Sequence, residues 1–172
     1  TFITHNHGNE ASYTEVLHKE WQLYREQIPQ LATTPIKQIH LGGGTPTFFS
    51  ADSLKKLLEP LMAQMAIDRN DFEGSIEVGP RVTHRDQLVA LRELGFQRLS
   101  MGVQDYDPEV QRLINRIQPE AVTRRITETA RELGFESVNH DLIYGLPGQT
   151  LPKIKRSAEI TVDMRPDRIA LY

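Results

Sequence analysis

Apolar residues recur every three or four positions along several parts of the chain, which is the spacing of one helical face. The first such stretch covers residues 13–28 and ends before Pro29. Ser12 and Glu15 have the spacing of a capping box, in which each side chain bonds a free backbone N–H of the first turn. The pattern therefore predicts a long amphipathic helix that starts at Ser12.

A second helical pattern covers residues 54–65, with Ser50 as its expected cap and Pro60 as an expected kink. Further helical patterns begin at residues that favour a helix start, namely Thr83, Asp107, Pro119 and Thr150. Short stretches rich in branched side chains separate the helices and predict strands. The expected strands are residues 36–41, 75–78, 98–103, 137–143 and 168–172.

The order of these elements defines the fold class. Strands that alternate with helices pair in parallel through right-handed crossovers, so the sheet is either doubly wound or part of a (β/α) barrel. A complete eight-stranded barrel needs about 250 residues, whereas this chain has 172. We expect a single α/β domain over residues 1–172 with five or six parallel strands. Because the pattern begins with a helix and ends with a strand, we also expect that neighbouring elements are missing at both ends.

The composition narrows the range of functions. With 20 Lys and Arg against 23 Asp and Glu, the formal net charge is −3, so no general attraction to nucleic acid or to anionic membranes is expected. No apolar run approaches the 18 residues of a membrane span, and the first residues lack a signal peptide, which favours the cytoplasm. Without cysteine, thiolate metal sites and disulfides are excluded within this chain. His5 and His7 lack partners at metal-ligand spacing, so no histidine metal site is expected either.

Glycines and polar residues gather where the expected strands end. Ligands of parallel α/β folds bind at the carboxyl ends of the strands. Gly42 to Thr47 follow the first strand as Gly-Gly-Gly-Thr-Pro-Thr; they either bring the backbone close to a ligand or only form a tight turn. Glu77 and Asp141 lie within strands, where a carboxylate needs a partner. For both we favour binding of a ligand over the alternatives, a solvent-facing edge residue for Glu77 and a helix cap for Asp141.

Four further polar positions are weaker indicators. Gln104 follows the third strand, and Arg116 lies in a helical region, where an arginine is usually a solvated surface charge. His40 and His140 lie in strands beside the glycines and Asp141, and for both a place in the core is favoured over one in the pocket.

Taken together, these segments resemble the radical S-adenosylmethionine (SAM) enzymes, and within them the family of oxygen-independent coproporphyrinogen III oxidases. The matching segments occur in the family's order and cover roughly residues 13–172. They are residues 40–47 (HLGGGTPT), 75–78 (SIEV), 98–105 (RLSMGVQD), 115–116 (NR) and 141–147 (DLIYGLP).

The resemblance implies an incomplete TIM-like (β/α)6 barrel of parallel strands, of which this chain would lack the first. It also implies a four-iron four-sulfur cluster and two SAM molecules near the carboxyl end of the barrel. Gly43 and Glu77 match family contacts to the SAM that the cluster binds. The family contacts to the second SAM are matched by Gly44, Thr45, Gln104, Arg116 and Asp141. SAM is a zwitterion with a ribose diol, so carboxylates and a guanidinium suit it.

The family reaction, as implied, uses an electron donor and a porphyrinogen substrate. An electron from the cluster cleaves SAM to methionine and a deoxyadenosyl radical, which abstracts a propionate hydrogen. Loss of carbon dioxide and of one further electron converts two propionates to vinyl groups and gives protoporphyrinogen IX for heme synthesis. The cofactors carry the difficult step, and the protein positions them. We expect a monomer.

The chain departs from the family in two places. The three cysteines spaced CxxxCxxC that hold the family's cluster are absent. Thr1 would follow that loop by a few residues, so we expect a central segment that is inactive alone. Gly79 stands where relatives usually carry Asp or Asn, which weakens the prediction of a pocket beside Glu77.

Two other functions compete with the oxidase. A related branch of the same superfamily carries heme without decarboxylating coproporphyrinogen, although residues 102–106 and 141–145 look more like the oxidase branch. The remaining alternative is a metabolic barrel that binds a sugar phosphate with its glycine loop, which predicts no affinity for SAM.

Overall fold

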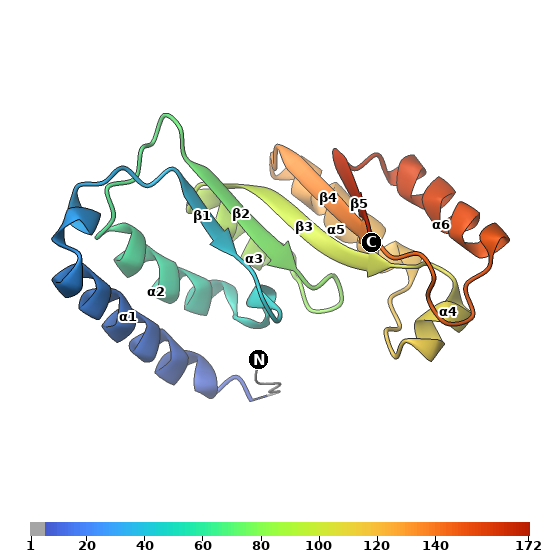
Figure 1. Ribbon diagram of the computed structural model, residues 1–172, viewed down its shortest axis with the longest axis horizontal. Helices are drawn as coiled ribbons and strands as arrows, with labels where there is room; N and C mark the ends of the chain where they lie inside the picture. The colour runs from blue at the N-terminus through green and yellow to red at the C-terminus, as the bar shows by residue number, and fades with distance from the viewer. Residues whose placement is uncertain (1–5) are drawn as a thin grey trace.

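The computed structural model describes residues 6–172, which form one parallel sheet covered by helices (Figure 1). The helices are α1 (Asn9–Gln27), α2 (Ala51–Met62), α3 (Arg85–Glu93), α4 (Pro108–Leu113), α5 (Glu120–Glu132) and α6 (Leu151–Met164), with short 3-10 turns η1 (Pro29–Ala32) and η2 (Pro46–Phe48). The strands are β1 (Gln38–Leu41), β2 (Glu73–Val78), β3 (Phe96–Gln104), β4 (Ser137–Leu142) and β5 (Arg168–Leu171).

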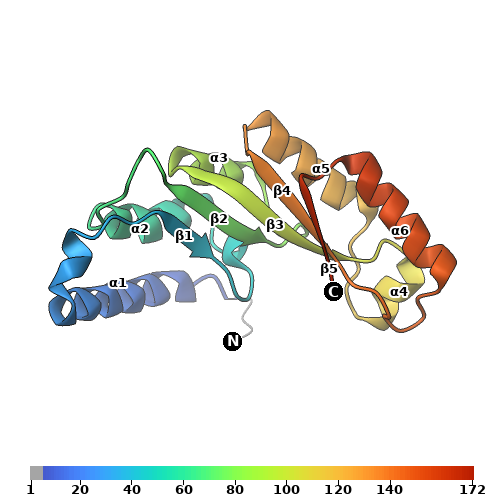
Figure 2. The ribbon, with the colours of Figure 1, turned by 45° about the horizontal axis from the view of Figure 1, so that its top comes forward.

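The strands lie in the sheet in their chain order, β1-β2-β3-β4-β5, and every neighbouring pair is parallel. A doubly wound sheet would reverse this order at a switch point, whereas a barrel keeps it. Figures 1 and 2 show the twisted sheet with α3 and α5 running behind its strands. The expected α/β class and the incomplete parallel barrel are confirmed. The sixth strand of that barrel remains a prediction.

Side chains alternate between the two faces of the sheet. In β3, Leu99, Met101 and Val103 are buried in the core on the helix-covered face. Ile76 of β2 and Val138 of β4 join them there. The residues between them point to the opposite face, which we call the open face. Because successive strand residues point to opposite sides, the core and the open face share the same strands.

Two helix starts differ from the sequence prediction. α1 begins at Asn9 rather than at Ser12, whose hydroxyl donates to Asn9 O at 3.0 Å inside the helix. Glu10 lies in the first turn of α1, where the positive end of the helix dipole favours a carboxylate. α3 begins after His84, since Thr83 Oγ1 lies 2.8 Å from both Gly79 O and Thr47 Oγ1 and does not cap.

Other helix starts follow the prediction, whereas the end of α2 does not. Ser50 Oγ accepts from Ser53 N at 3.1 Å and caps α2. Asp107 Oδ1 accepts from the N–H groups of Glu109 and Val110 and caps α4. Pro60 lies inside α2, which ends at Met62, before the predicted Met65.

Residues 6–172 contain neither a membrane-spanning helix nor a cluster of metal ligands. In this range no helix has both the length and the apolar character needed to cross a bilayer. The same residues contain no group of three His, Cys, Asp or Glu side chains arranged to hold a metal ion. His5 lies outside the described residues. His7 Nδ1 lies 2.5 Å from Glu10 Oε1, and its ring stacks on Phe48.

His140 lies in the core, as the sequence favoured. It is fully buried on the helix-covered face, and its Nε2 lies 3.0 Å from Thr127 Oγ1. Burial, together with the nearby charge of Arg131, lowers the pKa of His140 from 6.5 to about 4. The folded chain therefore keeps this imidazole neutral under conditions in which an unfolded chain would protonate it.

This pKa predicts a loss of stability in mild acid. As the pH falls from about 6.5 to about 4, the unfolded chain binds a proton that the folded chain does not, so the free energy of unfolding decreases by up to about 3 kcal/mol. Urea unfolding at pH 7 and pH 4.5 measures this loss. His140→Gln should show a smaller loss than the wild type, whereas His84→Gln, at an exposed position, should keep it. An unchanged pH dependence in His140→Gln would contradict the prediction.

Candidate functional site

The open face carries a row of polar side chains from three neighbouring strands. Glu77 pairs in register with Ser100, and Ser100 pairs with Asn139. Asp141 lies one step further toward the carboxyl end, opposite Gly102. The predicted site residues of β2, β3 and β4 therefore lie on one face and at one end of the sheet.

The glycine loop after β1 approaches Glu77. Gly43 N donates to Glu77 Oε2 at 3.2 Å. Gly43 and Gly44 have φ values of 74° and 57°, which glycine adopts readily and other residues rarely do. A Cβ on Gly42 would lie 2.6 Å from His40 Nε2 and 3.1 Å from Glu77 Oε1. The three glycines thus form a tight turn, which agrees with both interpretations, and their contact with a ligand stays a prediction.

His40 lies beside Glu77 on the open face. Its Nε2 is 3.6 Å from Glu77 Oε1, and its Nδ1 is 2.9 Å from Ser75 Oγ. More than half of the His40 side chain is exposed. The prediction that His40 lies in the core was therefore wrong. Side chains alternate along β1, so His40 points to the face opposite to that of Ile39 and Leu41.

A buried polar network anchors the glycine loop from behind. Thr47 Oγ1 accepts from Gly79 N at 3.1 Å. The Gln87 amide donates to Thr47 O at 2.7 Å and to Phe49 O at 2.5 Å, and its Oε1 accepts from His84 N at 2.7 Å. Helix α3 thereby fixes the segment that follows Thr45. The sequence pattern did not single out Gln87, since a glutamine on a helix usually faces water.

Gly79 packs against this loop. A Cβ on Gly79 would lie 2.7 Å from the Thr45 methyl group, so any side chain there would displace Thr45. The sequence prediction treated Gly79 as a weak point of the pocket beside Glu77. In the structure its small size instead makes room for Thr45.

Asp141 is held by two neighbours on the open face. Its carboxylate accepts from Ser100 Oγ at 3.1 Å and from Asn139 Nδ2 at 2.7 Å. Asn139 Nδ2 also donates to Ser100 Oγ at 2.8 Å. Asp141 caps no helix, because α6 starts after Thr150. Ser100 and Asn139 were missed by sequence reasoning, although their two-residue spacing from Gly102 and Asp141 placed them on the same face.

Gln104 and Arg116 meet above Gly102. A Cβ on Gly102 would lie 2.7 Å from Gln104 Nε2 and 2.9 Å from Arg116 Nη2. Arg116 Nη2 donates to Gly102 O at 2.9 Å. Gln104 Oε1 and Arg116 Nε are buried and have no hydrogen-bond partner. An unpaired buried acceptor and donor cost free energy unless a bound molecule satisfies them.

The environment of Arg116 differs from that of a surface arginine. Burial lowers its pKa, and the charge of Arg81 lowers it further. Between residues 6 and 172 no carboxylate lies within ion-pair distance of Arg116. A half-buried guanidinium without an acidic partner is suited to bind an anionic group of a ligand.

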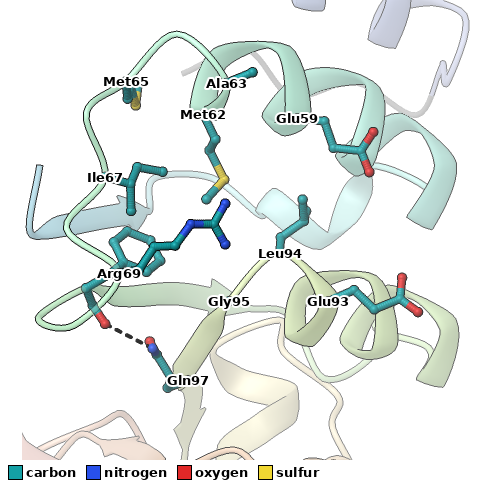
Figure 3. A pocket seen from close by; sticks show the side chains of 11 residues that line it. Glu59, Met62, Ala63, Met65, Ile67, Arg69, Glu93, Leu94, Gly95 and Gln97 are labelled. Atoms are coloured by element: carbon teal, nitrogen blue, oxygen red, sulfur yellow. Dashed lines mark hydrogen bonds between the residues drawn. The ribbon is translucent and has the colours of Figure 1, made fainter. Parts of the chain in front are cut away.

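A pocket of about 550 Å³ lies at the other end of the sheet. It is formed by the end of α2, the segment before β2 and the α3–β3 turn. Figure 3 shows Met62, Ile67, Arg69 and Leu94 around it. None of the predicted site residues lines this pocket, because they lie at the carboxyl ends of the strands.

Comparison with known protein families shows to which superfamily this chain belongs. The sequence model of the Radical SAM superfamily matches residues 11–160. The chain belongs to the radical SAM superfamily. Radical SAM proteins in general use SAM and a four-iron four-sulfur cluster, so both groups can be tested against the residues of this chain.

Two related sequences and one solved structure show which members of the superfamily this chain resembles. The oxygen-independent coproporphyrinogen III oxidase of Pseudomonas aeruginosa is 40% identical over 99% of this chain and 37% of its own length. That of Synechocystis is 37% identical over 100% of this chain and 36% of its own length. The structure of coproporphyrinogen III oxidase (HemN) from Escherichia coli superimposes with a TM-score of 0.92 at 38% identity, covering 99% of this chain and 38% of that one. The chain thus spans little more than a third of each relative.

The residues present fit SAM and do not fit the cluster. The unpaired Gln104 Oε1 and Arg116 Nε offer an acceptor and a donor, which match the ammonium and the carboxylate of a zwitterion. The 172 residues contain no cysteine, and iron–sulfur clusters are held by thiolates. SAM therefore has candidate contacts in this chain, and the cluster has no thiolate ligand in it.

Glu77 offers a direct test of SAM binding. Its side chain is half-exposed and makes few contacts, so Glu77→Ala should change the free energy of unfolding by less than about 1 kcal/mol. If Glu77 binds SAM, the affinity should fall by about tenfold, since a hydrogen bond to a charged group contributes about 1.5–3 kcal/mol. Equilibrium dialysis and thermal unfolding measure the two effects. A large loss of stability at unchanged affinity would identify a structural carboxylate instead.

Proposed function

We propose that this chain is the SAM-binding segment of an oxygen-independent coproporphyrinogen III oxidase. The observation that carries the proposal is the identity of 40% over 99% of the chain with an oxidase of that name. The polar open face supports it, because the matching motifs lie at one end of one sheet. The overall reaction is the oxidative decarboxylation of two propionates, which gives protoporphyrinogen IX.

In this proposal the chain positions SAM and the substrate. When bound, SAM supplies the radical that removes a hydrogen from a substrate propionate. Arg116 binds a carboxylate of SAM, and Gln104 accepts from a donor beside it. Asp141, which Ser100 and Asn139 hold in place, accepts from a hydroxyl or ammonium group. The residues proposed to contact one SAM are Gly43 and Glu77, and those proposed to contact a second are Gly44, Thr45, Gln104, Arg116 and Asp141.

The proposal also includes the electron donor, the oligomeric state, the location and the class of substrate. The enzyme requires a partner that donates electrons, and we propose that it works as a monomer in the cytoplasm. The near-neutral net charge of −3 supports a small-molecule substrate over a nucleic acid.

A hybrid protein tests the function. In it, this chain replaces the matching segment of the Pseudomonas aeruginosa oxidase, which supplies the remaining two-thirds. The hybrid, with its cluster reconstituted, should release carbon dioxide from coproporphyrinogen III and form vinyl groups. The unaltered oxidase is the positive control. Stoichiometric heme binding without any release of carbon dioxide would reject the oxidase and favour the heme-carrying alternative.

A further inference from the structure

Gln104 has an unusual backbone conformation. Its φ is 68°, and Asp105 N donates to Val103 O at 2.9 Å across it. This is a γ-turn with positive φ, which is rare and strained for a residue with a side chain. The pairing of β3 with β4 is interrupted at the same place, between Gly102 and Gln104. Such bulges re-aim a side chain, and here the turn directs the Gln104 amide over Gly102.

Asp105, the next residue, is a fully buried carboxylate. Its Oδ1 accepts from Ser157 Oγ at 2.8 Å and from Asp107 N at 2.6 Å, and its Oδ2 accepts from Gln149 Nε2 at 2.5 Å. No lysine or arginine of residues 6–172 pairs with it. A buried charge is costly unless its oxygens accept hydrogen bonds. The hydrogen bonds from these neutral donors therefore stabilise Asp105 in its buried position.

Gln149 connects Asp105 to the loop after β4. Its Nε2 also donates to Ile143 O at 3.0 Å, and its Oε1 accepts from Gly145 N at 2.7 Å. Ile143 N in turn donates to Gln104 O at 3.0 Å. Gln104 is therefore held on one side by the buried Asp105 and on the other by the segment that Gln149 fixes.

We propose that Asp105 and Gln149 are positioning residues, whose mutual hydrogen bond holds the turn that places the Gln104 amide beside Arg116. The proposal rests on the proposed function, in which Gln104 and Arg116 contact SAM. It gives a role to Asp105, which lies in a matching segment, and to Gln149, which lies just after one; the candidate site leaves both unused. Neither residue touches the ligand in this role, since both lie behind the turn.

Binding of SAM by the hybrid protein tests the consequence for the site. Asp105→Asn puts an amide N–H against either Gln149 Nε2 or Asp107 N, depending on the orientation of the amide. Gln149→Met removes the hydrogen bonds of Gln149 at similar volume. In folded protein, each variant should weaken SAM binding by about tenfold or more, since small displacements of positioned groups have large effects. Asp107→Ala is the matched control: it removes the cap of α4 two residues away, and the affinity should change by less than about twofold.

Hydrogen exchange in the 172-residue chain tests whether Asp105 and Gln149 hold the turn at Gln104. The amides of residues 105 and 143 should exchange faster in Asp105→Asn and Gln149→Met than in the wild type. In a Gln104→Gly background this acceleration should be smaller, because glycine adopts positive φ without strain. A purely structural role for Asp105 would accelerate exchange throughout the chain and would show no such rescue.

Each outcome decides the proposal. Weaker SAM binding together with faster exchange at the two amides supports it. Wild-type affinity in both folded variants, or weaker affinity without faster exchange, overturns it. If the wild-type hybrid binds no SAM, the proposed function fails, and the exchange rates alone decide whether Asp105 and Gln149 hold the turn.

Discussion

Arg116→Ala is expected to weaken SAM binding about a hundredfold and to reduce turnover in the hybrid oxidase. Arg116 is half-buried, and its Nε has no hydrogen-bond partner in residues 6–172. A charge-assisted hydrogen bond to a ligand carboxylate contributes up to about 3 kcal/mol, which corresponds to about two orders of magnitude in affinity. Equilibrium dialysis with SAM measures the affinity, and carbon dioxide release measures turnover.

The control for Arg116 is another arginine of the same region. Arg112 lies at an exposed position of α4, and Arg112→Ala should leave affinity and turnover unchanged. The absorption spectrum of the reconstituted cluster should be the same in both variants, because neither arginine is a cluster ligand. Normal turnover in Arg116→Ala would identify Arg116 as an ordinary structural arginine that binds Gly102 O.

Gln87→Leu is expected to destabilise the chain by about 3 kcal/mol. The substitution keeps the volume and leaves the carbonyls of Thr47 and Phe49 and the N–H of His84 without their partner. Each unpaired buried polar group costs about 1–3 kcal/mol, and relaxation recovers part of this. For a chain of this size the melting temperature should fall by about 6–12 °C, which calorimetry measures.

The matched control for Gln87 is Gln22→Leu, at an exposed position of α1. It makes the same chemical change without breaking a buried network, so its melting temperature should stay within about 2 °C of the wild type. If Gln87→Leu melted at the wild-type temperature, Gln87 would not anchor the glycine loop, and Thr45 would be positioned by its own backbone.

Local signals in the sequence were sufficient for the fold. Gly95 and Gly134 end α3 and α5 with φ values of 90° and 78°, as expected of left-handed helix ends. The regular order of elements restricted the sheet to two architectures. The start of α3 was wrong because Thr83 has a partner distant in sequence, Thr47. Contacts of this kind leave no local pattern.

The site was accessible to sequence reasoning only in part. Glu77 and Asp141 stood out because a carboxylate within a strand is unusual. Gln104 and Arg116 were only weak candidates without the family resemblance, since neither residue type is unusual in its segment. The unpaired atoms that now distinguish them depend on a turn at Gln104 and on the absence of a side chain at Gly102, and both are properties of three-dimensional structure.

The alternation of side chains along β2, β3 and β4 determines which substitutions the protein can tolerate. Odd and even positions of one strand are subject to different constraints: Ile76, Leu99 and Val138 must fill the interior, whereas Ser75, Ser100 and Asn139 lie on the opposite side. Libraries that randomise only the second set would vary recognition while leaving the scaffold intact. Single substitutions on this side can therefore change the specificity of the protein while the fold stays the same. They need no compensating changes in the hydrophobic interior.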